Sequence, residues 1–136
     1  MSAPAVSRWQ RLSWWATLPV SLGVAYGASA LTARARAFCD AAWEPPHRLV
    51  HLGELVLLAG GTVTAALLAA VAARRVTAGA SRPVRASAQL ASVLVVLGLL
   101  AWWYVSARAT PGGYPGDSGL CPASNVPPWW PGWLPS

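Results

Sequence analysis

Two histidines and a glutamate, His47, His51 and Glu54, stand at the start of a long apolar stretch of the chain. On an α-helix, spacings of four and three residues put all three side chains on one face. Histidines four positions apart can share one metal ion, and a nearby carboxylate can act as a further ligand or as a general base. The three residues therefore form a candidate site for a metal of unknown identity, a ligand or a proton.

A structural role suits the same three residues better. In the zinc-protease motif HExxH the glutamate lies between the histidines, whereas here Glu54 follows both of them. The cationic side chain of Arg48 also disfavours a cation bound beside it. In a structural cluster, Glu54 is protonated by burial or pairs with a neighbouring group. The candidate partners are His51, Arg34, Arg36 and Arg48.

The composition indicates an all-α membrane protein. Hydrophobic residues make up 55% of the 136 residues and charged residues only 10%, whereas about a quarter of the residues in a soluble domain are charged. Residues 12–33, 49–73 and 88–107 are long apolar stretches in which Glu54 is the single charged residue. Each stretch is long enough to cross the hydrocarbon layer as a helix, which needs about 20 residues. We predict three transmembrane helices over these ranges.

The first stretch also resembles a secretory signal peptide. Arg8 and Arg11 provide a basic start, and Ala28-Ser29-Ala30 matches the small-residue pattern of a cleavage site. The apolar stretch, however, is longer than a usual signal core and continues past this site to residue 33. We therefore expect an uncleaved span, and the N-terminal sequence of the membrane-extracted protein distinguishes the two interpretations.

The arginines predict the orientation of the spans, because cytoplasmic connections are enriched in basic residues. The connection over residues 74–87 carries no acid and four arginines, namely Arg74, Arg75, Arg82 and Arg85. We therefore expect residues 1–11 and 74–87 to be cytoplasmic. Residues 34–48 then form an outer loop, and residues 108–136 form an extracytoplasmic tail of a multi-pass protein of the cell membrane.

The formal net charge of +6 does not indicate nucleic-acid binding. The arginines flank the apolar stretches instead of alternating with aromatic residues on one soluble surface. Lysine and isoleucine are absent, whereas alanine, glycine, proline and arginine are abundant. This bias is typical of a GC-rich bacterial genome.

Under this topology Cys39 and Cys121 both face the exterior, where disulfides persist. We predict a bridge between them that tethers the tail to the first loop. The alternative is two unpaired thiols. A thioredoxin-type redox couple is not indicated, because the chain has no CxxC motif.

The tail is too rich in proline and glycine to form regular secondary structure or a core of its own. Trp129, Trp130 and Trp133 lie among its last prolines. The tail is expected to lie on the outer leaflet or to fold over the helices, or else to dock into a groove of a partner. Membrane disruption is disfavoured, because no basic residue follows Arg108 and the tail carries Asp117.

Small residues predict how the spans pack, because they let helix backbones approach closely in lipid. The first span contains Gly23 and Gly27 at a spacing of four residues. The second carries a row at the same spacing that continues toward Glu54, His51 and His47. This row consists of Gly61, Ala65 and Ala69. We expect these small residues to face the other helices.

No phosphate-binding loop, dinucleotide fingerprint or nucleophile elbow is present. We therefore expect a non-catalytic accessory or assembly subunit of a larger membrane complex, in contact with lipid and other membrane subunits and without a cofactor. The first alternative is a transport or metal-handling component with an outward-facing site at His47, His51 and Glu54. The second is a small membrane enzyme. Metal analysis of the purified protein and of its His51→Ala variant separates the first alternative from the others.

Overall fold

The computed structural model describes residues 8–39, 45–108 and 118–135. The side chains of residues 8–14 and 45–48 lie outside this description. The chain is all-helical, with α1 (Arg8–Cys39), α2 (Pro45–Val76) and α3 (Arg82–Arg108) in sequence order. All three helices are long and apolar enough to cross a membrane. This confirms the predicted all-α class with three candidate spans.

The helices extend beyond the apolar stretches that predicted them. The expected outer loop over residues 34–48 is largely helical, because α1 continues to Cys39 and α2 begins at Pro45. The expected connection over residues 74–87 shortens to a turn, since α3 already begins at Arg82. The length of an apolar stretch reflects the thickness of the hydrocarbon layer that it crosses. A helix can continue beyond that layer as long as its backbone groups are hydrogen-bonded. Pro45 fits the first turn of a helix, where its missing N–H is not needed.

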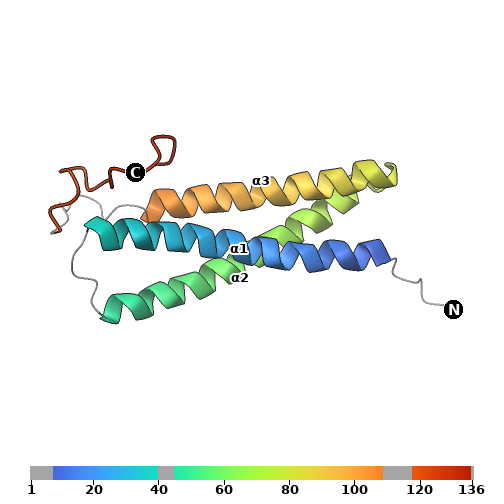
Figure 1. Ribbon diagram of the computed structural model, residues 1–136. Coiled ribbons are helices and arrows are strands. Elements are labelled where there is room, and N and C mark those ends of the chain that lie inside the picture. Colours follow the sequence, from blue (N-terminus) through green and yellow to red (C-terminus); the bar gives the residue numbers. More distant parts are fainter. Residues whose placement is uncertain (1–7, 40–44, 109–117, 136) are drawn as a thin grey trace.

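The three helices alternate in direction along one bundle (Figure 1). The last turn of α1, the first turn of α2 and the last turn of α3 lie at one end, together with the C-terminal segment. We call this the disulfide end and the opposite end, where a short turn joins α2 to α3, the turn end. The helices α2 and α3 lie close together at the turn end and diverge toward the disulfide end (Figure 1).

The bundle places small and polar side chains inside and large apolar side chains outside. The residues that α1 buries lie along one side of the helix, and all have small or hydroxyl side chains. They are Ser21, Ala25, Ala28, Ser29, Thr32, Ala35 and Cys39. Leucine, valine and tryptophan side chains cover much of the outer surface. In a bilayer this distribution is favourable, because lipid solvates the large apolar groups and small groups allow close helix contacts.

Hydroxyl groups join neighbouring helices inside the bundle. The Thr62 hydroxyl of α2 lies 3.4 Å from the carbonyl oxygen of Ser21 in α1 and 3.0 Å from that of Ala59 in its own helix. Ser92 of α3 donates toward the carbonyl oxygen of Ala69 in α2 over 3.3 Å. Such bonds contribute to helix association in lipid, where few water molecules compete for the same groups.

The turn between α2 and α3 is held by Arg85. Its guanidinium donates hydrogen bonds to the carbonyl oxygens of Thr77, Ala78 and Ala80. These carbonyls belong to the turn that follows α2, and the several N–H donors of one guanidinium can bind them together. Arg85 therefore has a structural role in addition to the topological signal that its charge provides.

The two glycines of α1 that we predicted to pack against another helix do not contact the other helices of this chain. Gly23 and Gly27 are exposed, and a Cβ atom added at either position would meet nothing within 4 Å. At about 100° per residue, Gly23 points to a different side of the helix from the buried Ser21 and Ala25. Alanine, serine and threonine are already small enough for the observed contacts, so glycine is not required there.

In α2, the most deeply buried position is offset by one residue from the predicted row of small residues. Ala66 is fully buried, whereas Ala65 and Ala69 are half-buried and Gly61 is exposed. The α2 contact with α3 is made by Ala66 together with Val93 and Leu97. Residues next to the predicted row therefore make the closest contact.

The two faces of α1 can be distinguished by adding the same side chain to each. We expect Ala25→Leu to lower the free energy of unfolding by about 1–3 kcal/mol, because the extra atoms overfill a closed contact. Gly23→Leu meets open space and should leave the stability of the bundle unchanged or slightly higher. Unfolding in mixed detergent–SDS micelles measures both variants, and equal losses would contradict the assignment of the buried face.

Candidate functional site

His51 connects α2 to α1. Its Nε2 atom lies 3.0 Å from the hydroxyl oxygen of Ser29, which is buried between the helices. Which of the two atoms donates depends on the tautomer of the imidazole. One of the three predicted site residues is thus engaged in a contact between helices.

Glu54 faces α3 and forms an ion pair there. Its Oε1 atom lies 2.6 Å from a terminal nitrogen of Arg108, with 19% and 45% of the respective side chains exposed. Arg108 is not among the partners that we predicted for Glu54, because it lies at the far end of the next helix. The return of α3 to the disulfide end brings the two charges together.

Arg36 extends this contact to the third helix. Its Nε atom donates a hydrogen bond of 2.9 Å to the backbone carbonyl oxygen of Arg108. This carbonyl belongs to the last turn of α3, where a cation is stabilised by the exposed carbonyl groups. Arg36, Arg108 and Glu54 therefore link α1, α3 and α2 at the disulfide end.

The structure describes two side chains of the predicted trio, those of His51 and Glu54. His51 and Glu54 lie on one helix but contact different neighbours, Ser29 and Arg108. Among the side chains that the structure describes, no group of three or more His, Cys, Asp or Glu residues could hold a metal ion. The backbone of His47 lies in the first turn of α2, and its side chain lies outside the described residues. Its part in a site stays a prediction.

A cavity of about 360 Å³ lies between α2 and α3 beside the ion pair. Its polar lining residues are Glu54, Arg108, Tyr104 and Thr62, and the others are leucines, Trp103 and Gly61. Gly61, which we predicted to pack against another helix, borders this cavity instead. A Cβ atom at Gly61 would meet nothing within 4 Å, so the glycine leaves the space open.

Tyr104, like Thr62, is a polar residue of this cavity that the sequence did not indicate. Its side chain is buried, with 6% of the residue exposed, and its hydroxyl has no hydrogen-bond partner among the described residues. A buried hydroxyl normally finds a partner, because leaving it without one is unfavourable. The residues that line the cavity therefore include a carboxylate, a guanidinium and a tyrosine whose buried hydroxyl has no partner among the described residues.

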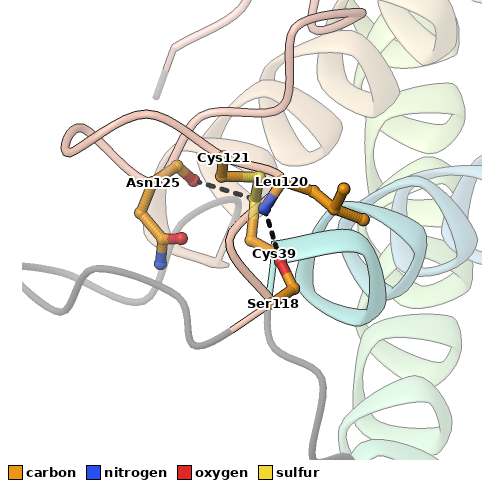
Figure 2. Close-up of a disulfide and its surroundings, with 5 residues drawn as sticks. All are labelled: Cys39, Ser118, Leu120, Cys121 and Asn125. Carbon is orange, nitrogen blue, oxygen red and sulfur yellow. Dashed lines mark hydrogen bonds between the residues drawn. A yellow bond between two sulfur atoms is a disulfide. The ribbon is translucent and has the colours of Figure 1, made fainter.

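Cys39 and Cys121 form the predicted disulfide, which spans 82 positions of the sequence. Figure 2 shows the bridge at the end of α1. The backbone N–H of Ser118 donates to the carbonyl oxygen of Cys39 over 3.1 Å. The Cys39 sulfur also lies 3.4 Å from the carbonyl oxygen of Asn125 (Figure 2), a contact without a proton because the sulfur is in a disulfide. These contacts hold the returning chain against the end of α1.

Residues 118–135, which we call the cap, fold over the disulfide end. Trp130 is buried against Ala28 and Ala35 of α1 and Tyr104 and Val105 of α3. The cap backbone forms successive turns, in which the N–H groups of Asn125, Trp130 and Leu134 donate to carbonyls three residues earlier. Proline at the accepting or neighbouring positions favours such turns by restricting φ.

The other two tryptophans of the cap are exposed. The ring of Trp129 contacts that of Phe38 edge-on, with centroids 6.1 Å apart. Trp133 is the most exposed of the three, at 70%. Of the three residues that we predicted to contact the bundle, lipid or a partner, Trp130 thus docks on the bundle.

Comparison with known proteins adds no relative. No family model matches the sequence, and no curated protein or solved structure matches the chain.

A double-mutant cycle measures the ion pair. We expect Glu54→Gln and Arg108→Gln to destabilise the bundle by less in combination than the sum of the single effects. The expected coupling is about 1 kcal/mol, since the pair is partly exposed and lies between helices. A second cycle, in which Arg82→Gln at the turn end takes the place of Arg108→Gln, should show no coupling. Equal coupling in the two cycles would show that general charge effects explain the result.

Release of the cap can be followed by chymotrypsin and mass spectrometry. We expect the Cys39→Ser/Cys121→Ser variant to be cut faster at the Trp129–Trp130 bond, because the bridge no longer holds Trp130 against the helices. Cutting after the exposed Trp133 serves as an internal control and should change less. An unchanged rate at Trp129 would show that packing alone retains the cap.

Proposed function

We propose that this chain is a non-catalytic accessory or assembly subunit of a larger complex in the cell membrane. The observation that carries the proposal is the open surface of α1 at Gly23 and Gly27. Glycines at a spacing of four residues allow a second helix to approach closely in lipid. The chain's own contacts use another face of α1, so this surface is available to a transmembrane helix of another subunit.

The polar contacts between the helices support a structural role. His51 is engaged with Ser29, and Glu54 is engaged with Arg108. Each of these two residues connects α2 to a neighbouring helix, and Glu54 also lines the cavity between α2 and α3. A bundle held in this way offers a partner a rigid surface.

The proposed orientation places the N-terminus and the turn end in the cytoplasm and the disulfide end outside. Arg74, Arg75, Arg82 and Arg85 gather at the turn end, as expected for a cytoplasmic connection. The bridge between Cys39 and Cys121 lies at the other end, and disulfides persist in oxidising compartments. The basic residues and the disulfide thus support the same orientation.

The cap provides a second contact surface in this proposal. Trp129 and Trp133 are exposed beside the disulfide end, while Trp130 holds their segment in place. Tryptophan suits both the headgroup region of a membrane and the centre of a protein interface. Pre-ordering by the disulfide and by prolines lowers the entropy lost when such a surface binds.

Co-purification in a mild detergent tests the assembly role. We expect specific membrane proteins to co-purify with the wild type and to be lost, by at least tenfold, from the Gly23→Leu/Gly27→Leu variant. The added side chains fill the close-approach surface without entering the bundle. Leu22→Phe, which adds bulk to another exposed side of α1, is the matched control and should retain the partners. A chain that purifies alone, or partners that survive the double substitution, would refute the proposed surface.

A further inference from the structure

We propose that the cavity between α2 and α3 binds the headgroup of a zwitterionic phospholipid. This inference is independent of the assembly role, because it concerns a different surface of the bundle. The cavity has a volume of about 360 Å³, within the range of small-ligand sites. It lies beside the charged pair at the disulfide end and reaches the apolar outer surface of the helices.

The charges of the cavity select a ligand that carries both signs. Glu54 and Arg108 are the two partners of one ion pair, so their combined charge is zero. A zwitterion can open this pair by placing an ammonium group against the carboxylate and a phosphate against the guanidinium. Both exchanges preserve charge pairing, and a phosphate can accept two parallel hydrogen bonds from arginine.

Ligands of a single charge do not satisfy the site. An anion that displaces Glu54 from Arg108 leaves the largely buried carboxylate without its counter-charge. A cation on Glu54 similarly leaves the guanidinium without its partner. Leaving either charge without a partner is unfavourable, and more so for Glu54, whose side chain is 19% exposed, than for Arg108, at 45%. The pair therefore disfavours both a purely anionic lipid and a free cation.

Tyr104 supplies the second observation that points to a ligand. Tyr104 lines the cavity, and its buried hydroxyl has no partner among the described residues. A phosphate or ester oxygen of the ligand can accept the proton of this hydroxyl. Binding would then satisfy a polar group that the bundle itself leaves without a hydrogen bond.

The apolar part of the cavity indicates that the headgroup belongs to a lipid and not to a soluble molecule. Leu57 and Trp103 line the cavity and are also 77% and 64% exposed on the outside of the bundle. The space is therefore continuous with a surface that faces acyl chains in a bilayer. When the headgroup is bound at the ion pair, the acyl chains of the lipid can lie along this surface. A soluble molecule without acyl chains would leave the surface uncovered.

Native mass spectrometry of the full-length protein in detergent tests the proposal. Phosphatidylethanolamine and phosphatidylglycerol are titrated separately, and soluble phosphoethanolamine provides a third arm. We expect the wild type to retain phosphatidylethanolamine at least tenfold more strongly than phosphatidylglycerol. Phosphoethanolamine alone should bind at least tenfold more weakly than the lipid, because it cannot cover the apolar wall.

Two neighbouring glycines give a matched pair of variants. Gly61 borders the cavity, whereas Gly60 does not, and a Cβ atom at either position meets open space. We expect Gly61→Leu to reduce retention of phosphatidylethanolamine at least tenfold and Gly60→Leu to leave it unchanged. Unfolding in SDS and formation of the Cys39–Cys121 bridge show whether both variants are folded.

Charge and hydroxyl variants test the headgroup contacts separately. The Glu54→Gln/Arg108→Gln variant should lose the discrimination between the two lipids, and Tyr104→Phe should weaken phosphatidylethanolamine binding several-fold. Equal retention by Gly61→Leu and Gly60→Leu overturns the proposal, because it indicates unspecific lipid around the bundle. Preference for phosphatidylglycerol, or equal binding of phosphoethanolamine and the lipid, overturns it as well.

Discussion

In a bilayer, burying an apolar side chain between helices brings little gain over leaving it in lipid. Three helices that associate in such a solvent depend on close backbone contact and on polar groups that find each other. The buried face of α1 meets the first requirement with side chains such as Ala25, Thr32 and Ala35. Hydrogen bonds such as that of Ser29 with His51 meet the second. The leucines and valines on the outside then need no protein partner.

The two ends of the bundle differ in how they are closed. At the turn end, Arg85 binds the carbonyls that follow α2, and the chain passes directly into α3. At the disulfide end the helices diverge (Figure 1), and more contacts are needed to hold them. The Glu54–Arg108 pair, the hydrogen bond from Arg36 and the bridged cap provide these contacts. The same divergence leaves the cavity between α2 and α3.

The disulfide constrains the cap more than the helices. For a soluble chain, closing a loop of 82 residues corresponds to about 4.5 kcal/mol in the chain-entropy treatment. Helices already inserted in a bilayer restrict the loop, so the gain to the bundle is smaller than this figure. Most of the effect falls on residues 118–135, which have no regular secondary structure. The bridge thereby turns a proline-rich segment into a defined surface with Trp130 docked beneath it.

The sequence by itself determined the number of helices, their order and the pairing of two cysteines. Each of these depends on simple signals, namely apolar length and the presence of just two thiols. Only the tertiary structure decided which face of each helix is buried, that Glu54 pairs with Arg108, and that Tyr104 borders a cavity. Lipid and a bundle interior both accept apolar and small residues, so hydrophobic periodicity does not distinguish the two faces. Partners 54 positions apart along the chain become neighbours only when α3 returns beside α2.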